Sequence, residues 1–538
     1  MNGAYSADQV RAAERPALDA GMGAVLMSRA AFGLAVAVQR LIRQRRGGLY
    51  GARAVALVGK GNNGGDGLWA LANLARRGVA VSAVLVDREA HAEGLAALRA
   101  AGGHVLSLPG VPTGREYLSF QDPQSDRYSR PVGVGEGVEV CCRADVVIDA
   151  ILGTGARGGL RGPAASLVGA LALAQAGQDG FPPVVACDVP SGVDPDTGEI
   201  HGPVLYAELT VTFAAAKAAL FLPPGARCAG RVEVVPIGVE ESLGEPVLGR
   251  LDAGEARALL PRPSADGHKY TRGVLGVVAG SEEYPGAALL ACSAALAAGA
   301  GMVRYYGPAS VCAVINAVLP EVVCHSGTAV PEKRLPGRVQ AWLLGSGVSG
   351  DEQLDRCRAA LGSGEPAVVD AGALDLVGPG TDRPELILTP HAGELALLLS
   401  RLGTEWNREE VEARSLAALS EAVESTGVTV LLKGPQTLVR SPGGLGYSQA
   451  DGTPWLATAG SGDVLAGVLG ALLAQAASAE GADDDGRWAR VAALAAVVHG
   501  RAGRIASGEA AGGVGRPLTA RDVAAAVPLV WDDIRTGR

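Results

Sequence analysis

The sequence predicts an α/β protein made of two domains, each built on a mostly parallel sheet. The chain has 538 residues, which is more than one domain usually holds. Along both halves, short apolar runs that suit buried strands alternate with longer apolar stretches that suit helices, an order typical of parallel sheets covered by helices. The stretch 237–251 becomes charged and contains glycine and proline, and the motifs before it do not recur after it. We therefore predict one domain over residues 1–241 and a different, fused domain over residues 242–538.

The composition excludes several classes of protein. Hydrophobic residues make up 48% of the chain and charged residues 19%, which favours packed cores over disorder. The net charge is −9 and the one basic run, 40–46, is short, so nucleic-acid binding is not expected. The N-terminus lacks a signal-peptide core, and no uninterrupted apolar run reaches the ~20 residues of a membrane span. Eight cysteines without a C-x-x-C pair indicate buried free thiols. We expect a cytoplasmic homo-oligomer that binds no membrane.

The first domain begins with a helical pattern over 6–46 and continues as a βαβ unit. An apolar strand over 54–58 runs into the glycine-rich loop 59–67, which is followed by a helix over 68–75 and a strand over 80–86. In a parallel sheet such a loop lies at the carboxyl edge, where ligands bind.

The loop 59–67 is more polar than a tight turn requires. It contains five glycines but matches neither G-x-G-x-x-G nor a P-loop. Asn62, Asn63 and Asp66 offer amide and carboxylate groups that suit an amide, a ribose or a weakly held cation. A generic glycine-rich turn is the alternative, and we favour a functional loop.

Two further strands of this domain end in glycine and acid. The strand 145–149 is followed by the loop 150–159, and the strand 184–188 by the loop 189–194. In a doubly wound sheet these loops converge with the first one, so together they predict a site. Residues 104–142 are expected to be irregular.

These three loops, together with LMSRAA at 26–31 and TFAAAK at 212–217, resemble the YjeF N-terminal domain, the NAD(P)H-hydrate epimerase family, over roughly residues 8–240. The resemblance implies a Rossmann-like doubly wound fold that interconverts the R and S hydrates of NADH and NADPH, called NADHX and NADPHX.

The same resemblance implies the residues of the site. A potassium ion would be held by Asn63, Asp149 and Ser191, whose oxygen ligands are hard enough to suit it. Asp188 is the candidate acid or base that opens and recloses the hydrated nicotinamide ring. The residues implied to line the hydrate are Asn62, Asn63, Gly64, Gly65, Asp66, Gly153, Thr154, Gly155, Ala156, Arg157, Gly158, Gly159 and Asp188.

The second domain again alternates strands with helices. Strands are predicted over 273–279, 342–344, 367–370, 385–388 and 429–432, each followed by a small or polar loop. A parallel α/β sheet with another row of loops at its carboxyl edge follows from this order.

Near the end of the chain, the turn Gly460–Ser461–Gly462 precedes an apolar helix over 464–474. The free N–H groups at such a helix start suit a phosphate. Asp463 would repel phosphate there, which makes sense if it takes a proton from a hydroxyl next to the phosphate. Helix capping by Asp463 is the alternative.

Two other loops add candidates. Lys433 is followed by Gly434 and Thr437. These neighbours favour a role in binding a nucleotide phosphate over that of a merely solvated lysine. His391 follows a strand between Pro390 and Gly393, where a cleft role and a buried structural role are about equally favoured. This layout is that of ribokinase-like phosphotransferases.

The order of motifs in the second domain resembles the YjeF C-terminal domain, the ADP- or ATP-dependent NAD(P)H-hydrate dehydratases. HKY at 268–270, LTPHAGE at 388–394, KGPQT at 433–437 and AGSGD at 459–463 carry the resemblance. It implies a ribokinase-like fold, hydrate contacts from Ala287, Gly347, His391 and Asp463, nucleotide contacts from Lys433, Gly434, Pro435, Gln436, Thr437 and Gly462, and Mg²⁺ bound with the nucleotide.

The sequence departs from the family pattern at two places. Residues 345–349 read Gly-Ser-Gly-Val-Ser where the family usually has Gly-Pro-Gly-Leu-Gly, and Gly372 stands where the family usually has a second aspartate.

The resemblances together predict a bifunctional metabolite-repair enzyme, an isomerase fused to a lyase. Water is a poor leaving group, and phosphorylation of the hydroxyl would convert that hydroxyl into a good one. Asp463 would accept the hydroxyl proton in this step. With ADP the products would be AMP and phosphate; ADP is favoured for bacterial members, and the residues leave ATP open. A small-molecule kinase with a fused nucleotide-binding domain is the alternative enzyme, and a first domain that only binds nucleotides or a partner protein is the non-enzymatic one.

Overall fold

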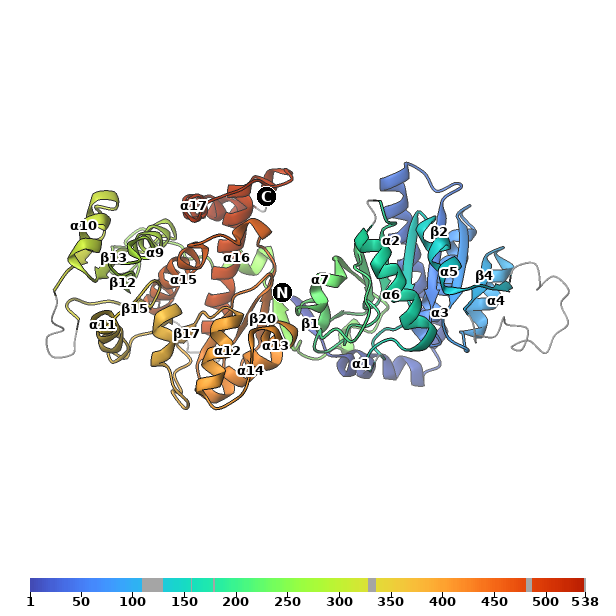
Figure 1. Cartoon of the computed structure of the whole chain (residues 1–538), viewed down its shortest axis with the longest axis horizontal. Coiled ribbons are helices and arrows are strands. Elements are labelled where there is room, and N and C mark those ends of the chain that lie inside the picture. The colour runs from blue at the N-terminus through green and yellow to red at the C-terminus, as the bar shows by residue number, and fades with distance from the viewer. Residues whose placement is uncertain (109–128, 156, 178–179, 328–334, 480–485, 537–538) are drawn as a thin grey trace. The chain divides into compact units, whose positions relative to one another are not determined.

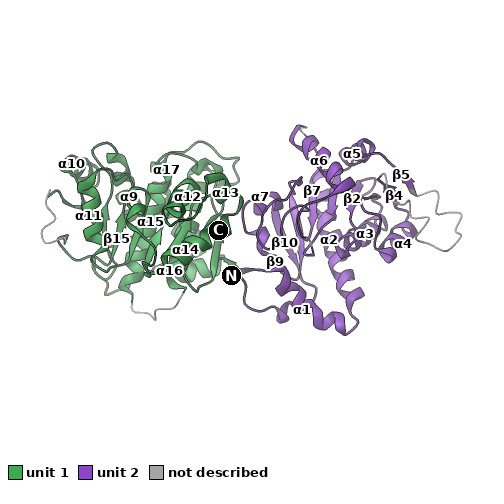
Figure 2. Cartoon of the chain, turned by 60° about the horizontal axis from the view of Figure 1, so that its bottom comes forward, with its two compact units in different colours: residues 1–2, 248–538 green, residues 3–247 purple. Residues whose placement is uncertain are grey.

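A computed structural model describes residues 1–108, 129–155, 157–177, 180–327, 335–479 and 486–536. The chain forms two compact units, one of residues 3–247 and one of residues 1–2 with 248–538 (Figure 2). We call them the N-terminal and the C-terminal unit.

The N-terminal unit has a sheet of strands that are all paired in parallel, in the order β10-β8-β7-β6-β2-β3-β4-β5. The strands of this sheet are β2 (Arg53–Val58), β3 (Ala80–Leu85), β4 (His104–Ser107), β5 (Ser129–Pro131), β6 (Val146–Ala150), β7 (Val184–Cys187), β8 (Leu209–Phe213) and β10 (Arg231–Val235). Two short strands outside it, β1 (Asn2–Tyr5) and β9 (Ala216–Lys217), pair with each other in parallel. The helices of the unit are α1 (Ala7–Asp19), α2 (Gly23–Arg46), α3 (Asn62–Ala75), α4 (Ala92–Ala100), α5 (Val134–Cys142), α6 (Gly162–Gly177) and α7 (Gly225–Ala229). Figure 1 labels β2 and β4 of this sheet and the helices α2 to α6 of the same unit.

The burial of the central strands is typical of a parallel sheet. β6 and β7 are buried along their whole length, as expected for strands covered by helices on both faces. Helices α2, α3 and α4 pack on one another, and α5 packs on α6. The strand order reverses between β2 and β6, and such a switch point is where doubly wound sheets bind ligands. The predicted α/β fold class is confirmed.

Three local predictions in this unit are wrong. The helical pattern over 6–46 breaks into α1 and α2. The stretch 104–142, expected to be irregular, contains β4, β5 and α5, which are too short or too rich in glycine to give a clear periodic signal; residues 109–128 lie outside the described part. Helix α3 begins at Asn62 rather than at Leu68, so the polar residues of the glycine-rich loop form its first turns.

The C-terminal unit contains a larger sheet, in the order β14-β13-β12-β15-β16-β17-β18-β19-β20-β11. It is parallel from β14 to β18, and β19 then runs antiparallel to both of its neighbours. Its strands are β11 (Leu248–Arg250), β12 (Val274–Val278), β13 (Met302–Tyr306), β14 (Val323–His325), β15 (Ala341–Leu344), β16 (Ala367–Val369), β17 (Leu386–Leu388), β18 (Thr429–Leu432), β19 (Thr437–Arg440) and β20 (Gly446–Gln449).

Helices α9, α15, α16 and α17 pack on one another, and α15 also contacts β12, β15 and β16. The strand order reverses between β12 and β15, so the loops that follow these two strands lie at a second switch point. The helices of this unit are α8 (Ala253–Leu259), α9 (Pro285–Ala297), α10 (Ala309–Val318), α11 (Asp351–Leu361), α12 (Ala392–Arg401), α13 (Arg408–Ala413), α14 (Ser415–Thr426), α15 (Ser461–Ser478), α16 (Arg487–Ser507) and α17 (Ala520–Thr536).

Two helices, α2 and α15, are long and apolar enough to cross a membrane. Their most apolar windows are 56% and 67% buried within the structure, and α15 packs closely against α9. These are properties of core helices as well, so their length and composition alone are weak evidence of a membrane span.

Candidate active sites

At the first switch point, Asn63, Asp149 and Ser191 come together from α3, β6 and the loop after β7. Ser191 donates to Asp149 twice, from its hydroxyl at 2.6 Å and from its backbone N–H at 2.8 Å. The Asn63 amide donates to the carbonyl of Leu152 at 2.9 Å, which leaves its Oδ1 buried without a hydrogen-bond partner. Burial also raises the pKa of the Asp149 carboxyl, against the hydrogen bonds from Ser191. Leu152 links the two parts, because its N–H donates to Ser191 Oγ at 2.9 Å while its carbonyl accepts from Asn63. An unpaired amide oxygen, a hydroxyl and a buried carboxyl are oxygen ligands that fit a hard cation such as K⁺.

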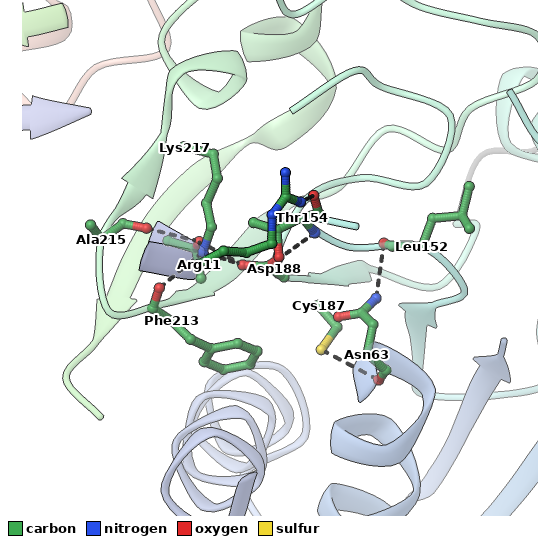
Figure 3. Close-up of polar contacts among 10 residues, drawn as sticks. Arg11, Asn63, Leu152, Thr154, Cys187, Asp188, Phe213, Ala215 and Lys217 are labelled. Carbon is green, nitrogen blue, oxygen red and sulfur yellow. Dashed lines mark hydrogen bonds and ion pairs between the residues drawn. The ribbon is translucent and has the colours of Figure 1, made fainter. Parts of the chain in front are cut away.

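Asp188 lies next to this group in an uncommon backbone conformation. Its φ is 70°, in the left-handed region that costs energy for a residue with a side chain. The backbone N–H of Thr154 donates to one carboxylate oxygen at 2.9 Å, and Thr212 and Lys217 donate to the other (Figure 3). Strain at a buried carboxylate with three donors is the kind of feature that occurs at functional sites.

Lys217 keeps Asp188 ionised. Its Nζ is 2.5 Å from Asp188 Oδ1, and its side chain is only 1% exposed. Burial by itself would raise the pKa of Asp188, but the charge and hydrogen bond of Lys217, together with the hydrogen bonds from Thr154 and Thr212, outweigh burial, so the pKa is lowered. Lys217 lies in the motif at 212–217, but sequence reasoning gave it no role. The signal that could have found it is a single lysine in an otherwise apolar run.

Two other carboxyl groups near Asp188 have the opposite tendency. Burial raises the pKa of Asp66 well above its usual value, and the charges of Asp188 and Glu14 raise it further. Burial likewise raises the pKa of Glu14, on α1, a residue that sequence reasoning missed. The site thus combines a carboxyl group whose pKa is lowered with two carboxyl groups whose pKa values are raised, an arrangement suited to moving protons.

The loop after β6 approaches the site closely. A Cβ on Gly153 would lie 3.1 Å from both Asn63 Oδ1 and Asp188 Oδ2. Thr154 is fixed on its other side by Arg11, whose Nη1 donates to the Thr154 carbonyl at 2.8 Å. Ala156 lies outside the described residues.

The other predicted hydrate-lining residues are placed as follows. Gly64 packs on the Gly59 carbonyl, Gly65 on His91 and Gly159 on the His201 carbonyl, whereas Asn62, Gly155, Arg157 and Gly158 are exposed.

The second site is centred on Asp463, in the first turn of α15. Gly460, with a φ of 86°, caps this helix in the left-handed conformation that its turn requires. Burial and the charge of Asp370 raise the pKa of Asp463 to about 6, and Lys433 opposes them. The Asp463 carboxylate is therefore ionised at neutral pH while remaining basic enough to take a proton.

Asp370, at the end of β16, connects Lys433 to the sheet. Its Oδ1 accepts from Lys433 Nζ at 2.9 Å and from the Thr389 hydroxyl at 2.8 Å, and its Oδ2 accepts from the Ser346 hydroxyl at 2.7 Å. Burial would lower the pKa of Lys433, but Asp370 and Glu394 raise it overall. Sequence reasoning missed Asp370, although an acid that ends an apolar strand was a usable signal.

His391 is 60% exposed in its side chain and caps helix α12. Its ring nitrogen Nδ1 accepts from the Glu394 N–H at 3.1 Å. An isolated parallel β-bridge joins the backbones of His391 and Lys433, so the two residues are neighbours. Ala287 and Gly347 meet separately: Gly347 has a φ of 64°, and a Cβ on it would lie 2.5 Å from Ala287 Cβ. The structure thus brings Ala287 and Gly347 together and places His391 beside Lys433.

The predicted nucleotide residues lie between β18 and β19 and at the start of α15. A Cβ on Gly462 would be 3.7 Å from Lys433 Nζ, so the turn and the loop 433–437 are neighbours. Gly434 and Pro435 are exposed, Thr437 is half-buried, and Gln436 has a buried Oε1 with no hydrogen-bond partner.

Within the described residues, no group of three or more His, Cys, Asp or Glu side chains is arranged to hold a metal ion. Mg²⁺ usually retains waters and binds through substrate phosphates with one or two carboxylates, so it does not need such a group.

Two family models match the chain. The model described as YjeF-related protein N-terminus matches residues 23–219, and the model described as NAD(P)H-hydrate dehydratase matches residues 275–522.

Individual proteins are similar over most of the chain. The bifunctional NAD(P)H-hydrate repair enzyme Nnr of Mycobacterium tuberculosis is 40% identical over 480 residues, which cover 87% of this chain and 89% of the relative. The protein of the same name from Mycobacterium leprae is 40% identical over 502 residues, covering 91% and 94%. Among solved structures, the ADP/ATP-dependent NAD(P)H-hydrate dehydratase from Bacillus subtilis, co-crystallised with ATP and Mg²⁺, has 26% identity and a TM-score of 0.46 over 53% of this chain and 98% of that chain.

Proposed function

The chain belongs to the family of bifunctional NAD(P)H-hydrate repair enzymes, and we propose that each of its two units carries one of the two activities. It is an NAD(P)H-hydrate epimerase and an NAD(P)H-hydrate dehydratase. The site around Asp188 would interconvert the R and S hydrates of NADH and NADPH, and the site around Asp463 would dehydrate the S hydrate.

The Asp188–Lys217 ion pair carries the proposal for the epimerase. An ionised carboxylate can take the proton of the ring hydroxyl, whereupon the carbon–nitrogen bond breaks and the carbon becomes an aldehyde. The bonding electrons go to the ring nitrogen. When the aldehyde has turned its other face to the nitrogen, the ring closes and the proton returns to oxygen. The neighbouring Asp66 and Glu14 are suited to hold protons during this exchange.

A K⁺ ion would be held by Asn63, Asp149 and Ser191 in this proposal. The support is the buried Asn63 Oδ1, which has no hydrogen-bond partner, beside the Asp149–Ser191 pair. When bound, the ion supplies positive charge at the edge of the hydrate site. Asn63 also donates to the carbonyl of Leu152, so an ion bound to Asn63 would help to hold the adjoining loop with Gly153 and Thr154 in place.

For the dehydratase, the single observation that carries the proposal is Asp463 beside the N–H groups at the start of α15. Asp463 would take the hydroxyl proton while the oxygen attacks the terminal phosphorus of ADP or ATP. The bond from that phosphorus to the bridging oxygen breaks, and AMP or ADP leaves. The helix start would stabilise the transferring phosphoryl group, with Mg²⁺ bound to the nucleotide. The carbon–oxygen bond then breaks, phosphate leaves, and loss of a proton from the neighbouring carbon restores the ring double bond.

The test uses the separated R and S hydrates, each incubated without nucleotide, with ADP and with ATP. We expect recovery of the reduced-nicotinamide absorbance from the S hydrate only when nucleotide is present, and slower recovery from the R hydrate when Asp188 is replaced by alanine. A stable phosphate ester as the final product would instead favour a small-molecule kinase. Failure of the unaltered protein to interconvert the hydrates would contradict the epimerase assignment.

A further inference from the structure

A half-buried histidine lies against the turn at the proposed phosphate site of the dehydratase. The Nε2 atom of His499, on α16, lies 3.1 Å from the hydroxyl oxygen of Ser461, the first residue of α15. Ser461 is only 6% exposed. The proposed reaction uses neither side chain, so a hydrogen bond between residues 38 positions apart at the proposed phosphate site needs a reason of its own.

His499 is held firmly by the packing of α16. A Cβ on Gly500 would lie 2.8 Å from the backbone of Asp451 and Gly452, and one on Gly503 would lie 2.7 Å from Leu456. Helix α16 is therefore in close contact with the segment that leads into the turn. The ion pair between Arg501 and Asp451, at 3.3 Å, joins the same two elements.

The imidazole of His499 is uncharged at neutral pH. Burial lowers its pKa to about 4, against the raising effect of the Ser461 backbone. A neutral imidazole has one N–H group, which lies on either Nδ1 or Nε2. If Nε2 carried no proton, it would accept the Ser461 hydroxyl proton and leave that hydroxyl with nothing to donate to a phosphate.

A phosphoryl group at neutral pH offers acceptor oxygens and therefore needs donors around it. The helix start supplies backbone N–H groups, and Ser461 adds a donor only if its own oxygen accepts from His499. The two requirements select one tautomer of the imidazole, the one with the proton on Nε2.

We propose that His499 is a positioning residue of the dehydratase: its Nε2–H donates to Ser461 Oγ, so that the Ser461 hydroxyl is free to donate to the phosphoryl group of the nucleotide. This inference rests on the proposed nucleotide site at the start of α15. It adds a side-chain donor to the backbone donors of that site and makes α16 part of the dehydratase machinery.

The experiment compares His499→Met, His499→Gln, Ser461→Ala and the double variant His499→Met/Ser461→Ala in the full chain. Methionine fills a similar volume but cannot donate, whereas the glutamine amide can donate from a similar place. We expect His499→Met and Ser461→Ala to lose kcat by about a hundredfold to a thousandfold, as for removal of one donor to a group that develops charge in the transition state. His499→Gln should keep most of the activity, and the double variant should be no slower than the slower single variant.

The KM for the S hydrate should change little in these variants, and ADP affinity, measured by calorimetry with Mg²⁺, should fall in His499→Met and Ser461→Ala. A histidine with a merely structural role would lower the melting temperature without this selective loss. Full kcat in His499→Met, or losses that add in the double variant, would overturn the proposal. If the unaltered protein binds ADP but dehydrates nothing, the proposed function fails, and the ADP affinities of the variants still decide the role of His499.

Discussion

The ammonium group of Lys217 lies 2.5 Å from a carboxylate oxygen of Asp188, and the two side chains are 1% and 7% exposed. A buried ion pair is costly to break from one side, because the remaining charge is then left without compensation. The same pair lowers the pKa of Asp188 against the effect of its burial. The stability of the N-terminal unit and the protonation state of the proposed epimerase base therefore depend on the same lysine.

Replacement of Lys217 by methionine should destabilise the N-terminal unit by about 3–5 kcal/mol at pH 7, because Asp188 remains buried as an uncompensated anion. The deficit should shrink as the pH falls, because a protonated Asp188 no longer requires a cation. Urea unfolding at several pH values measures this. Arg45→Met, which breaks the exposed pair with Glu208, is the matched control and should cost less than about 1 kcal/mol. A Lys217→Met variant as stable as the Arg45→Met control would contradict the prediction.

Dehydration of the S hydrate should slow as the pH falls through about 6, the value to which burial and Asp370 raise the pKa of Asp463. The protonated form of Asp463 cannot accept the hydroxyl proton, so the slope should correspond to one proton. Lys433→Met should move the midpoint to higher pH, because Lys433 favours the charged form of Asp463. Rates at saturating hydrate and nucleotide check this, with epimerisation by the same preparation as the internal control. A midpoint that does not move in Lys433→Met would show that another group titrates.

Asp463→Asn should abolish dehydration and yet stabilise the C-terminal unit at pH 8. The folded pKa of Asp463 is raised above its unfolded value of about 4, so folding loses stability as the pH rises from about 4 to 6. Asparagine removes that loss, which corresponds to about 1–3 kcal/mol. Thermal unfolding of the variant and the unaltered protein should therefore differ at pH 8 and converge near pH 4. Equal unfolding curves at both pH values would be inconsistent with a raised pKa.

Gly153→Ala should slow epimerisation by about tenfold and leave dehydration unchanged. The new Cβ would lie 3.1 Å from the side chains of Asn63 and Asp188, so at least one of them must shift by a few tenths of an ångström. Gly135→Ala is the control in the same unit, because a Cβ there would meet no atom within 4 Å and Gly135 is not a predicted site residue. Interconversion of the pure R hydrate gives the readout. Equal rates in Gly153→Ala and Gly135→Ala would contradict the prediction.

The sequence was sufficient to predict the α/β fold and the loops at the strand ends, because apolar strands and glycine-rich loops leave local patterns. It also predicted that the three loops containing Asn63, Asp149 and Ser191 converge, since parallel strands bring their carboxyl ends to one edge, whereas the choice of these three residues came from the family resemblance. Partners of the key carboxylates were missed: Lys217 and Asp370 lie in ordinary apolar segments. A lone charged residue in such a segment is visible in the sequence, but the charged partner that it meets is decided by three-dimensional packing.

The departures from the family pattern at residues 345–349 and at Gly372 are in contact. A Cβ on Gly372 would lie 2.7 Å from the carbonyl oxygen of Val348, a backbone atom that cannot rotate away. Gly372→Asp should therefore push on the loop that brings Gly347 against Ala287, with a cost to stability of about 1–3 kcal/mol and a higher KM for the S hydrate. Gly378→Ala, where a Cβ would meet no atom within 4 Å, is the matched control.

A combined variant separates this contact from a general intolerance of an acid at position 372. It joins Gly372→Asp to Ser346→Pro, Val348→Leu and Ser349→Gly, which together restore the usual family pattern. If the loop and position 372 are adapted to each other, the combined variant should be more stable and have a lower KM for the hydrate than Gly372→Asp alone. Substitutions at contacting residues are expected to depart from additivity in this way. Strictly additive effects in urea unfolding and hydrate kinetics would mean that the two departures arose independently.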